Sequence, residues 1–390
     1  MPNQKTVTVF LGIHNGEKYL ESLFNQIENQ DSRNFNLLLV DNASKDKSFN
    51  IIKDWHKKLT NIDVQVIRNP KNLGAGGSLN LNLDLIDTPW FITMHQDDFY
   101  KSNHISVLLA LINQAGDEIS GASATMGSMT NEGKKMKPFP RSTWFGSELD
   151  KYGQFLQNIK SQSIPFPCTA FKTDIYKKTR VLIHNPSFSD TEQTLKMLCH
   201  GKFLVTNEET MLYRENPISE SHSLNGNERE IGAYLGLNRV FASKLFVEFI
   251  QALDRDKSFN YLQLLNGAIE ERIKDSKLQQ VLQISLLENL LESIGSEHKE
   301  LIKILSNKYE NFASLQTLKN LSNLGEFSID LVHIQDRSVR EFPGWKKKLW
   351  DKYFLSQISF PDLIHKKTIK TLYKIVFWIK PNHRWNTKWK

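Results

Sequence analysis

The sequence predicts an α/β protein, with a mostly parallel sheet that carries helices on both faces and a C-terminal helical region. Three observations support this class. Four runs of apolar and β-branched residues lie within the first hundred positions, and each ends abruptly in polar residues. Helical patterns separate these runs, so strand, polar turn and helix recur in the order typical of parallel sheets. After about Gly226 the pattern becomes helical, with few strand signals.

The first predicted strand covers residues 7–13 and ends in the polar turn His14-Asn15-Gly16. The second covers residues 35–40 and ends at Asp41, and the third covers residues 64–67 before a polar, glycine-rich stretch. A helical pattern follows each of these ends. Because ligands of parallel sheets bind at the carboxyl ends of the strands, the polar ends are expected to meet at one edge.

The fourth strand begins at Trp90 and runs directly into Asp97 and Asp98, the most informative stretch of the chain. A strand end that delivers carboxylates into a cleft is where an α/β protein holds a divalent metal and the diphosphate bound to it. Taken alone, the two residues could equally form a solvated turn, since Asp is a common turn former.

Five segments of the first hundred residues form an ordered set. In chain order, they are Gly12-Ile13-His14-Asn15, Glu17-Lys18-Tyr19-Leu20, Val40-Asp41-Asn42-Ala43-Ser44, Asn72-Leu73-Gly74 and His95-Gln96-Asp97-Asp98. Together they resemble the inverting family-2 glycosyltransferases, which have the GT-A (Rossmann-like) fold. The last segment resembles the metal motif of that family, Asp-x-Asp followed by Asp, with its first aspartate replaced by His95.

Two further segments, Ala75-Gly76-Gly77 and Asp190-Thr191-Glu192, resemble the rhamnosyltransferase-like subset of the family. Tyr213-Arg214, with His222 and Ser223 after it, resembles the region that closes the catalytic domain. Each segment alone is weak, but their order is specific. The resemblance covers about the first 225 residues.

The resemblance implies a metal site for Mn²⁺ or Mg²⁺, with Asp97 as the protein ligand and His222 as a second candidate ligand. Such a cation neutralises the charge that develops on a departing diphosphate. His95 could replace the usual aspartate by hydrogen bonding, or it could weaken the metal dependence. A structural histidine at a strand end is the alternative.

The resemblance also implies a nucleotide-sugar site. Asp41 is suited to accept a hydrogen bond from N3–H of uracil or thymine, or to cap a helix that starts near Lys45. His14 and Asn15 would lie beside the base and ribose, or merely end a strand. The other donor-binding candidates are His95, Gln96, Asp97, Asn72, Gly74, Gly76 and Gly77. For the glycine-rich stretch among them, a flexible turn is the alternative.

Inverting transfer requires a base that takes the proton of the acceptor hydroxyl. Asp190 matches the base position of the family, and Glu192 is the alternative candidate. The two would not share a helix face, so one of them is expected in the cleft. Asp190 could instead serve only as a cap for a helix over residues 191–199.

The sequence predicts three regions: a catalytic domain over residues 1–225, a helical appendage over 226–336 and a basic tail over 337–390. The tail holds fourteen Lys and Arg against three Asp and Glu, and five of the eight tryptophans. Basic residues interleaved with tryptophan are typical of an amphipathic segment on an anionic membrane. A solvated basic face whose aromatic residues pack internally, and a nucleic-acid-binding tail, are the alternatives.

These features together predict an inverting, metal-dependent glycosyltransferase of the hexosyltransferase type. It would move a sugar from a UDP- or dTDP-sugar to a glycan, free or lipid-linked, in the synthesis of a cell-surface polysaccharide such as capsule or cell wall. A non-catalytic binding protein remains an alternative because of His95. With two cysteines, no signal peptide and no apolar run of membrane-spanning length, the chain is expected in the cytoplasm, peripheral at the inner face of the cell membrane. Neither the donor sugar, the acceptor nor the oligomeric state follows from the sequence.

Overall fold

The computed structural model describes residues 5–58, 62–136, 149–161, 163–181, 188–216, 226–253 and 255–274, with the single residues 282 and 286. The chain divides into two units, Met1–Asn225 and Gly226–Lys390. The predicted basic tail over residues 337–390 lies outside the described residues.

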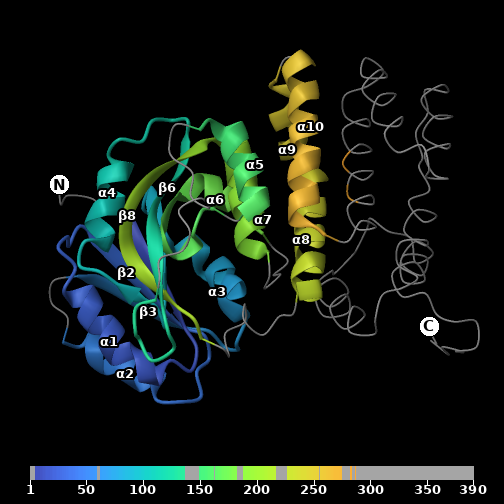
Figure 1. The fold of residues 1–390 in the computed structure, drawn as a ribbon. Coiled ribbons are helices and arrows are strands. Elements are labelled where there is room, and N and C mark those ends of the chain that lie inside the picture. The colour runs from blue at the N-terminus through green and yellow to red at the C-terminus, as the bar shows by residue number, and fades with distance from the viewer. Residues whose placement is uncertain are drawn as a thin grey trace, which may run out of the picture. The chain divides into compact units, whose positions relative to one another are not determined.

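The described residues of the first unit form an eight-stranded sheet with the order β3-β2-β1-β4-β7-β6-β8-β5 (Figure 1). Its parallel half consists of β3 (Asp63–Arg68), β2 (Phe35–Asp41), β1 (Val7–Ile13) and β4 (Trp90–His95). The other half consists of β7 (Thr169–Lys172), β6 (Ile119–Met129), β8 (Lys202–Arg214) and β5 (Phe99–Tyr100).

Four strand pairings are parallel and three are antiparallel, so the predicted class of a mostly parallel α/β sheet is confirmed. The predicted strand over residues 7–13 is β1 itself, and β2 extends one residue beyond its prediction, to Asp41. Both strands are almost completely buried, because helices cover the sheet on both sides.

The direction of each crossover between parallel strands determines which face of the sheet its helix covers. Successive steps from β1 to β2 and from β2 to β3 move the same way, so α1 (Glu17–Glu28) and α2 (Ser48–His56) lie side by side on one face (Figure 1). The step from β3 to β4 reverses, and a right-handed crossover then places α3 (Gly74–Asn82) on the opposite face.

The remaining helices of this unit complete the two layers. α4 (His104–Ile112) joins the α1 face, where Ile105 N donates to Gln30 Oε1 at 3.1 Å. α5 (Lys151–Ser161), α6 (Thr173–Thr179) and α7 (Ser189–His200) pack together, and α6 adjoins the α3 region through Lys177 Nζ, which donates to Ile86 O at 2.8 Å.

The strand order reverses between β1 and β4, which creates a crevice at the carboxyl edge of the sheet. In the register, Gly12 lies opposite His95, Ile13 opposite Asp41 and Asp41 opposite Arg68. The polar ends of the strands therefore meet at one edge, as the sequence predicts.

The glycine-rich stretch begins a helix, so its alternative interpretation as a flexible turn is wrong. Gly74 begins α3, so Gly74, Gly76 and Gly77 form its first turn. The Asn72 side chain lies next to this helix start, where its Oδ1 accepts a hydrogen bond from Gly74 N at 2.9 Å. Gly74 itself has φ 71°, a left-handed conformation that glycine adopts without strain.

The second unit is helical where it is described, with α8 (Gly226–Phe241), α9 (Lys244–Gln251) and α10 (Arg255–Arg272). Ser243 caps α9 through a hydrogen bond from Phe246 N to its Oγ at 3.2 Å. Apolar residues at helical spacing are buried here, namely Ile231, Leu235, Val240, Phe246 and Phe249. Within the described ranges, no helix combines the length and apolarity that crossing a bilayer would require.

Candidate functional site

The polar ends of β1 and β4 are joined by one side chain. Gln96 accepts a hydrogen bond from His14 N at 2.9 Å, and its amide nitrogen donates to His14 O at 3.0 Å. Gln96 thereby continues the pairing of two strands that separate at this point. The Gln96 amide bonds to both the N–H and the carbonyl of His14, so it holds the turns after β1 and β4 together.

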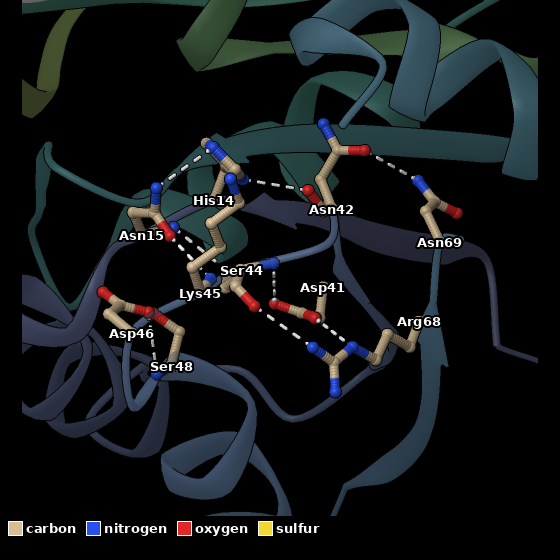
Figure 2. Close-up of polar contacts among 10 residues, drawn as sticks. All are labelled: His14, Asn15, Asp41, Asn42, Ser44, Lys45, Asp46, Ser48, Arg68 and Asn69. Atoms are coloured by element: carbon tan, nitrogen blue, oxygen red, sulfur yellow. Dashed lines mark hydrogen bonds and ion pairs between the residues drawn. The ribbon is translucent and has the colours of Figure 1, made fainter. Parts of the chain in front are cut away.

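A second set of amides joins β2, β3 and the start of α3. Asn42 donates from Nδ2 to Asn72 Oδ1 at 2.8 Å, and Asn69 donates to Asn42 Oδ1 at 3.0 Å. His14 reaches this set through Nδ1, which lies 2.9 Å from Asn42 O. Figure 2 shows His14, Asn42 and Asn69 in this arrangement. Asn72 Oδ1 therefore accepts from both the Asn42 side chain and Gly74 N, next to the start of α3.

The turns after β1 and β2 interlock. Asn15 N donates to Ser44 Oγ at 3.0 Å, and Lys45 N donates to Asn15 Oδ1 at 2.8 Å (Figure 2). Asn15 has φ 49° and Ala43 has φ 58°, a region that side chains other than glycine seldom adopt. Backbone strain of this kind concentrates at ligand-binding sites.

Asp41 ends β2 with a fully buried side chain. Arg68 Nε lies 3.0 Å from its Oδ2, and Ser44 N donates to its Oδ1 at 3.3 Å (Figure 2). The same Arg68 donates to Ser44 O at 3.1 Å and lies 4.4 Å over the Phe49 ring. A buried carboxylate and a half-exposed guanidinium thus stand side by side at the rim.

The helix expected near Lys45 begins at Ser48, and Asp46 rather than Asp41 serves its first turn. Ser48 N donates to Asp46 Oδ1 at 3.0 Å, and Glu17 N donates to Asp46 Oδ2 at 3.1 Å. Burial opposes the charged form, but the hydrogen bonds from Ser48 and Glu17 outweigh it and lower the pKa of Asp46. The helix-capping alternative for Asp41 is therefore wrong, although Asp41 does close a turn to Ser44.

The acidic motif follows β4. Asp98 is buried; its Oδ1 accepts from Arg214 N at 2.9 Å, and its Oδ2 lies 3.5 Å from His95 Nδ1. Burial disfavours a charged imidazole, but the hydrogen bond and charge of Asp98 outweigh burial and raise the pKa of His95. His95 is thus a partner of Asp98, with 37% of its side chain exposed at the edge of the sheet.

Asp97 is the less buried member of the acidic pair. Its Oδ2 lies 3.3 Å from Asn216 Nδ2, and its main-chain oxygen accepts from Arg214 Nε at 2.6 Å. Asp97 lines a cleft of about 240 Å³ together with residues of α1, β8 and the turn after β6. The carboxylate is therefore accessible to a ligand, whereas that of Asp98 is occupied internally.

Asp190 and Glu192 differ in their surroundings. Asp190 is exposed in the first turn of α7. Burial lowers the pKa of His95, but Asp98 and Asp97 raise it, and the charge of Asp190 adds a smaller contribution in the same direction. Glu192 is buried, and Lys196 Nζ lies 2.9 Å from its Oε1. Phe188 occupies the cap position of α7, and no side-chain hydrogen bond caps the helix in the described part of the chain. The capping alternative for Asp190 is therefore wrong.

Sequence reasoning missed three residues beside Asp97, namely Tyr19, Arg214 and Asn216. His222 was chosen from the closing region, and it lies outside the described residues. Arg214 was part of the Tyr-Arg resemblance, but no sequence pattern indicates that it reaches the acidic motif across more than a hundred positions.

The residues around Asp97 fit a divalent cation that is bound partly by the protein and partly by substrate phosphates. Within the described ranges, no three His, Cys, Asp or Glu side chains converge as a closed metal cage. Magnesium-like ions instead use one or two carboxylates together with substrate phosphates and water. Asp97, which lines the cleft and is only partly buried, suits this shared mode of binding.

The first unit is similar to known proteins. Residues 8–180 match the family model described as Glycosyl transferase family 2. Over 111 residues the chain is 29% identical to a teichoic acid poly(glycerol phosphate) polymerase of Staphylococcus epidermidis. The aligned segment makes up 27% of this chain and 15% of that protein. Over 97 residues it is 22% identical to a processive diacylglycerol beta-glycosyltransferase of Mycoplasma pneumoniae, 25% of this chain and 28% of that protein. The chain spans less than half the length of these curated relatives.

Two solved structures are similar at low identity. S. aureus TarS 1-349 in complex with UDP-GlcNAc aligns with a TM-score of 0.48 and 16% identity, over 73% of this chain and 89% of that one. The mannosyltransferase PcManGT from Pyrobaculum calidifontis, in complex with GDP-Man and Mn²⁺, aligns with a TM-score of 0.45 and 12% identity, over 75% of this chain and 89% of that one.

Proposed function

We propose that this chain, which carries a glycosyl transferase family 2 domain over residues 8–180, transfers a hexose from a UDP- or dTDP-sugar to a glycan acceptor with inversion. One observation carries the proposal. The ends of β1, β2 and β4 meet at the carboxyl edge of the sheet, where Asp41 ends β2 and Asp97 lies two residues beyond the end of β4. This is where α/β sheets bind nucleotides.

Asp41 and Arg68 support a pyrimidine base. Uracil and thymine present an N3–H donor between two carbonyl acceptors. A carboxylate beside a guanidinium, 3.0 Å apart, offers the matching acceptor and donor. The strained turn at Asn15, with His14 beside it, would then contact the base and ribose.

The diphosphate would lie between α3 and Asp97. The first turn of α3 brings backbone N–H groups and the positive end of a helix dipole to the rim, near Asn42, whose Nδ2 lies 3.2 Å from Gly74 O. Asp97 would hold Mn²⁺ or Mg²⁺, which supplies charge neutralisation for the leaving diphosphate when bound. His222 stays a candidate second ligand.

Asp190 is our choice of base. It is exposed, and its charge reaches His95 at the edge that bears the acidic motif, whereas Glu192 is buried against Lys196. A carboxylate at this position would take the proton of the acceptor hydroxyl as the new glycosidic bond forms, which contributes about 10²–10⁴-fold in typical enzymes.

The acceptor and the place of action are also proposals. We infer a glycan acceptor, free or lipid-linked, in cell-wall or capsule synthesis, and two of the relatives named above act on teichoic acid and diacylglycerol. The basic, tryptophan-rich residues 337–390 would hold the enzyme at the inner face of an anionic membrane.

Calorimetric titration with UDP, dTDP, GDP and ADP, each with and without Mn²⁺, tests the donor site. UDP or dTDP should bind at least about tenfold more tightly with Mn²⁺, and Asp97→Ala should abolish that gain together with donor hydrolysis. Equal binding of all four nucleotides, or full activity of Asp97→Ala, would overturn the proposal. Because His95 replaces a carboxylate of the family motif, metal-dependent UDP binding without hydrolysis or transfer would favour a non-catalytic binding protein.

A further inference from the structure

Arg214, the last residue of β8, contacts both members of the acidic pair. Its backbone N–H donates to Asp98 Oδ1 at 2.9 Å. Its side chain donates from Nε to Asp97 O at 2.6 Å and from Nη1 to Asn131 O at 2.6 Å. One guanidinium therefore ties the turn after β4 to the turn after β6, while its own backbone orients the buried carboxylate.

The residue two positions further on contacts the other end of Asp97. Asn216 is buried, and its Nδ2 lies 3.3 Å from Asp97 Oδ2 and 3.4 Å from the Tyr19 hydroxyl. The Arg214 guanidinium lies 5.4 Å from the centre of the Tyr19 ring. The peptide and the carboxylate of Asp97 are thus both fixed from the segment that ends β8.

Asp97 needs such contacts to hold its peptide and its carboxylate in place. Asp97 lies in a turn between β4 and β5, where no sheet ladder holds its carbonyl. A carboxylate that binds a cation must keep its orientation, and hydrogen bonds behind a ligand typically change metal affinity about 10- to 100-fold when removed. A planar guanidinium can bond two carbonyls at once, whereas a lysine ammonium lacks that fixed fork.

We propose that Arg214 is a positioning residue of the donor site, which fixes the Asp97 peptide so that the carboxylate keeps one orientation in the cleft. Affinity for a divalent cation in the presence of UDP then depends on Arg214, although Arg214 need not touch either ligand. This inference rests on the proposed function, because it assumes that Asp97 binds a cation together with a nucleoside diphosphate.

The test compares Arg214→Lys with a matched control, Arg33→Lys. Arg33 also donates to two main-chain carbonyls, Ile27 O at 2.8 Å and Glu28 O, but at the end of α1 away from the acidic motif. Free Mn²⁺ is measured by electron paramagnetic resonance during titration of the full chain with UDP present. Thermal unfolding is measured for each variant.

Arg214→Lys should raise the dissociation constant of Mn²⁺ at least about tenfold and change metal-free UDP binding less than about twofold. Arg33→Lys should leave both constants unchanged. If Arg214→Lys does not fold, Asn216→Ala removes the contacts with the Asp97 carboxylate and the Tyr19 hydroxyl while leaving Arg214 in place, and it should still raise the Mn²⁺ constant several-fold.

Unchanged Mn²⁺ affinity in a folded Arg214→Lys or Asn216→Ala protein, with a wild type that binds Mn²⁺ and UDP together, overturns this inference and leaves the proposed function intact. A wild type that binds no Mn²⁺ with UDP overturns both.

Discussion

Acid is expected to destabilise the first unit through His104, the first residue of α4. Its imidazole is completely buried, with Nδ1 2.9 Å from Thr210 Oγ1 and the ring 4.8 Å from that of Tyr100. A protonated imidazole needs a hydrogen-bond acceptor at both nitrogens, and Nε2 is buried without a partner among the described residues. Burial accordingly lowers the pKa of His104 to about 3.

The magnitude follows from the difference between the folded and unfolded chains. An unfolded histidine titrates near pH 6.5 or so. Between about pH 6.5 and about pH 3 the folded state binds fewer protons than the unfolded state, so stability falls as the pH falls through that window. One pKa unit corresponds to about 1.4 kcal/mol, and lowering the pH from 7.5 to 5 therefore removes about 2 kcal/mol of the free energy of unfolding.

Urea unfolding at pH 7.5 and at pH 5, followed by tryptophan fluorescence, measures this loss. His104→Gln stays neutral across the range, so its loss between the two pH values should be smaller than that of the wild type by about 2 kcal/mol. His56→Gln makes the same chemical change at an exposed position of α2 and serves as the control. An equal loss in His104→Gln and the wild type would refute the reasoning, because the acid sensitivity would then belong to other groups.

The remaining predictions concern the base, the nucleotide and the tail. Asp190→Asn should keep donor affinity within a few fold and lower turnover by about 100-fold in a donor-transfer assay; a loss seen only in Glu192→Gln would reassign the base. Asp41→Asn should weaken UDP binding at least about tenfold by calorimetry, and undiminished affinity would remove Asp41 from the base site. Deletion of residues 337–390, which carry a net charge of +11, should abolish sedimentation with anionic liposomes. Salt should weaken the same association in the full chain, since charges are screened beyond roughly 10 Å at 0.1 M.

The sequence predicts the parallel half of the sheet well because those strands are short apolar runs with sharp polar ends. β1 is buried on both faces, so its boundaries coincide with the change from apolar to polar residues. The glycine-rich stretch is harder to predict, because glycine has a low helix propensity and yet begins α3. Asn72 Oδ1 accepts a hydrogen bond from Gly74 N at the start of this helix, a local contact that apolar periodicity does not reveal.

The candidate site was predictable only where its parts are local. Asp97 and Asp98 adjoin a strand, so the sequence reveals them directly. Their partners come from elsewhere: Arg214 lies on β8, and Arg68 meets Asp41 only through the register between β2 and β3. Such contacts depend on which strands become neighbours, and periodicity carries no information about strand order.

The bridge between Gln96 and the β1 turn couples two positions that lie far apart in the sequence, 16 and 96. A methyl group added to Gly16 would lie 2.5 Å from Gln96 Oε1, so alanine at that position would require the end of the Gln96 side chain to move away from His14. A shorter side chain at residue 96 would likewise no longer reach both His14 N and His14 O. Related proteins should therefore change the two positions together or leave both unaltered, and a library that randomises them separately should yield few active members. A paired change that restored the bridge would alter the spacing of the crevice, which makes these positions the place to begin redesigning which donors the edge of the sheet accepts.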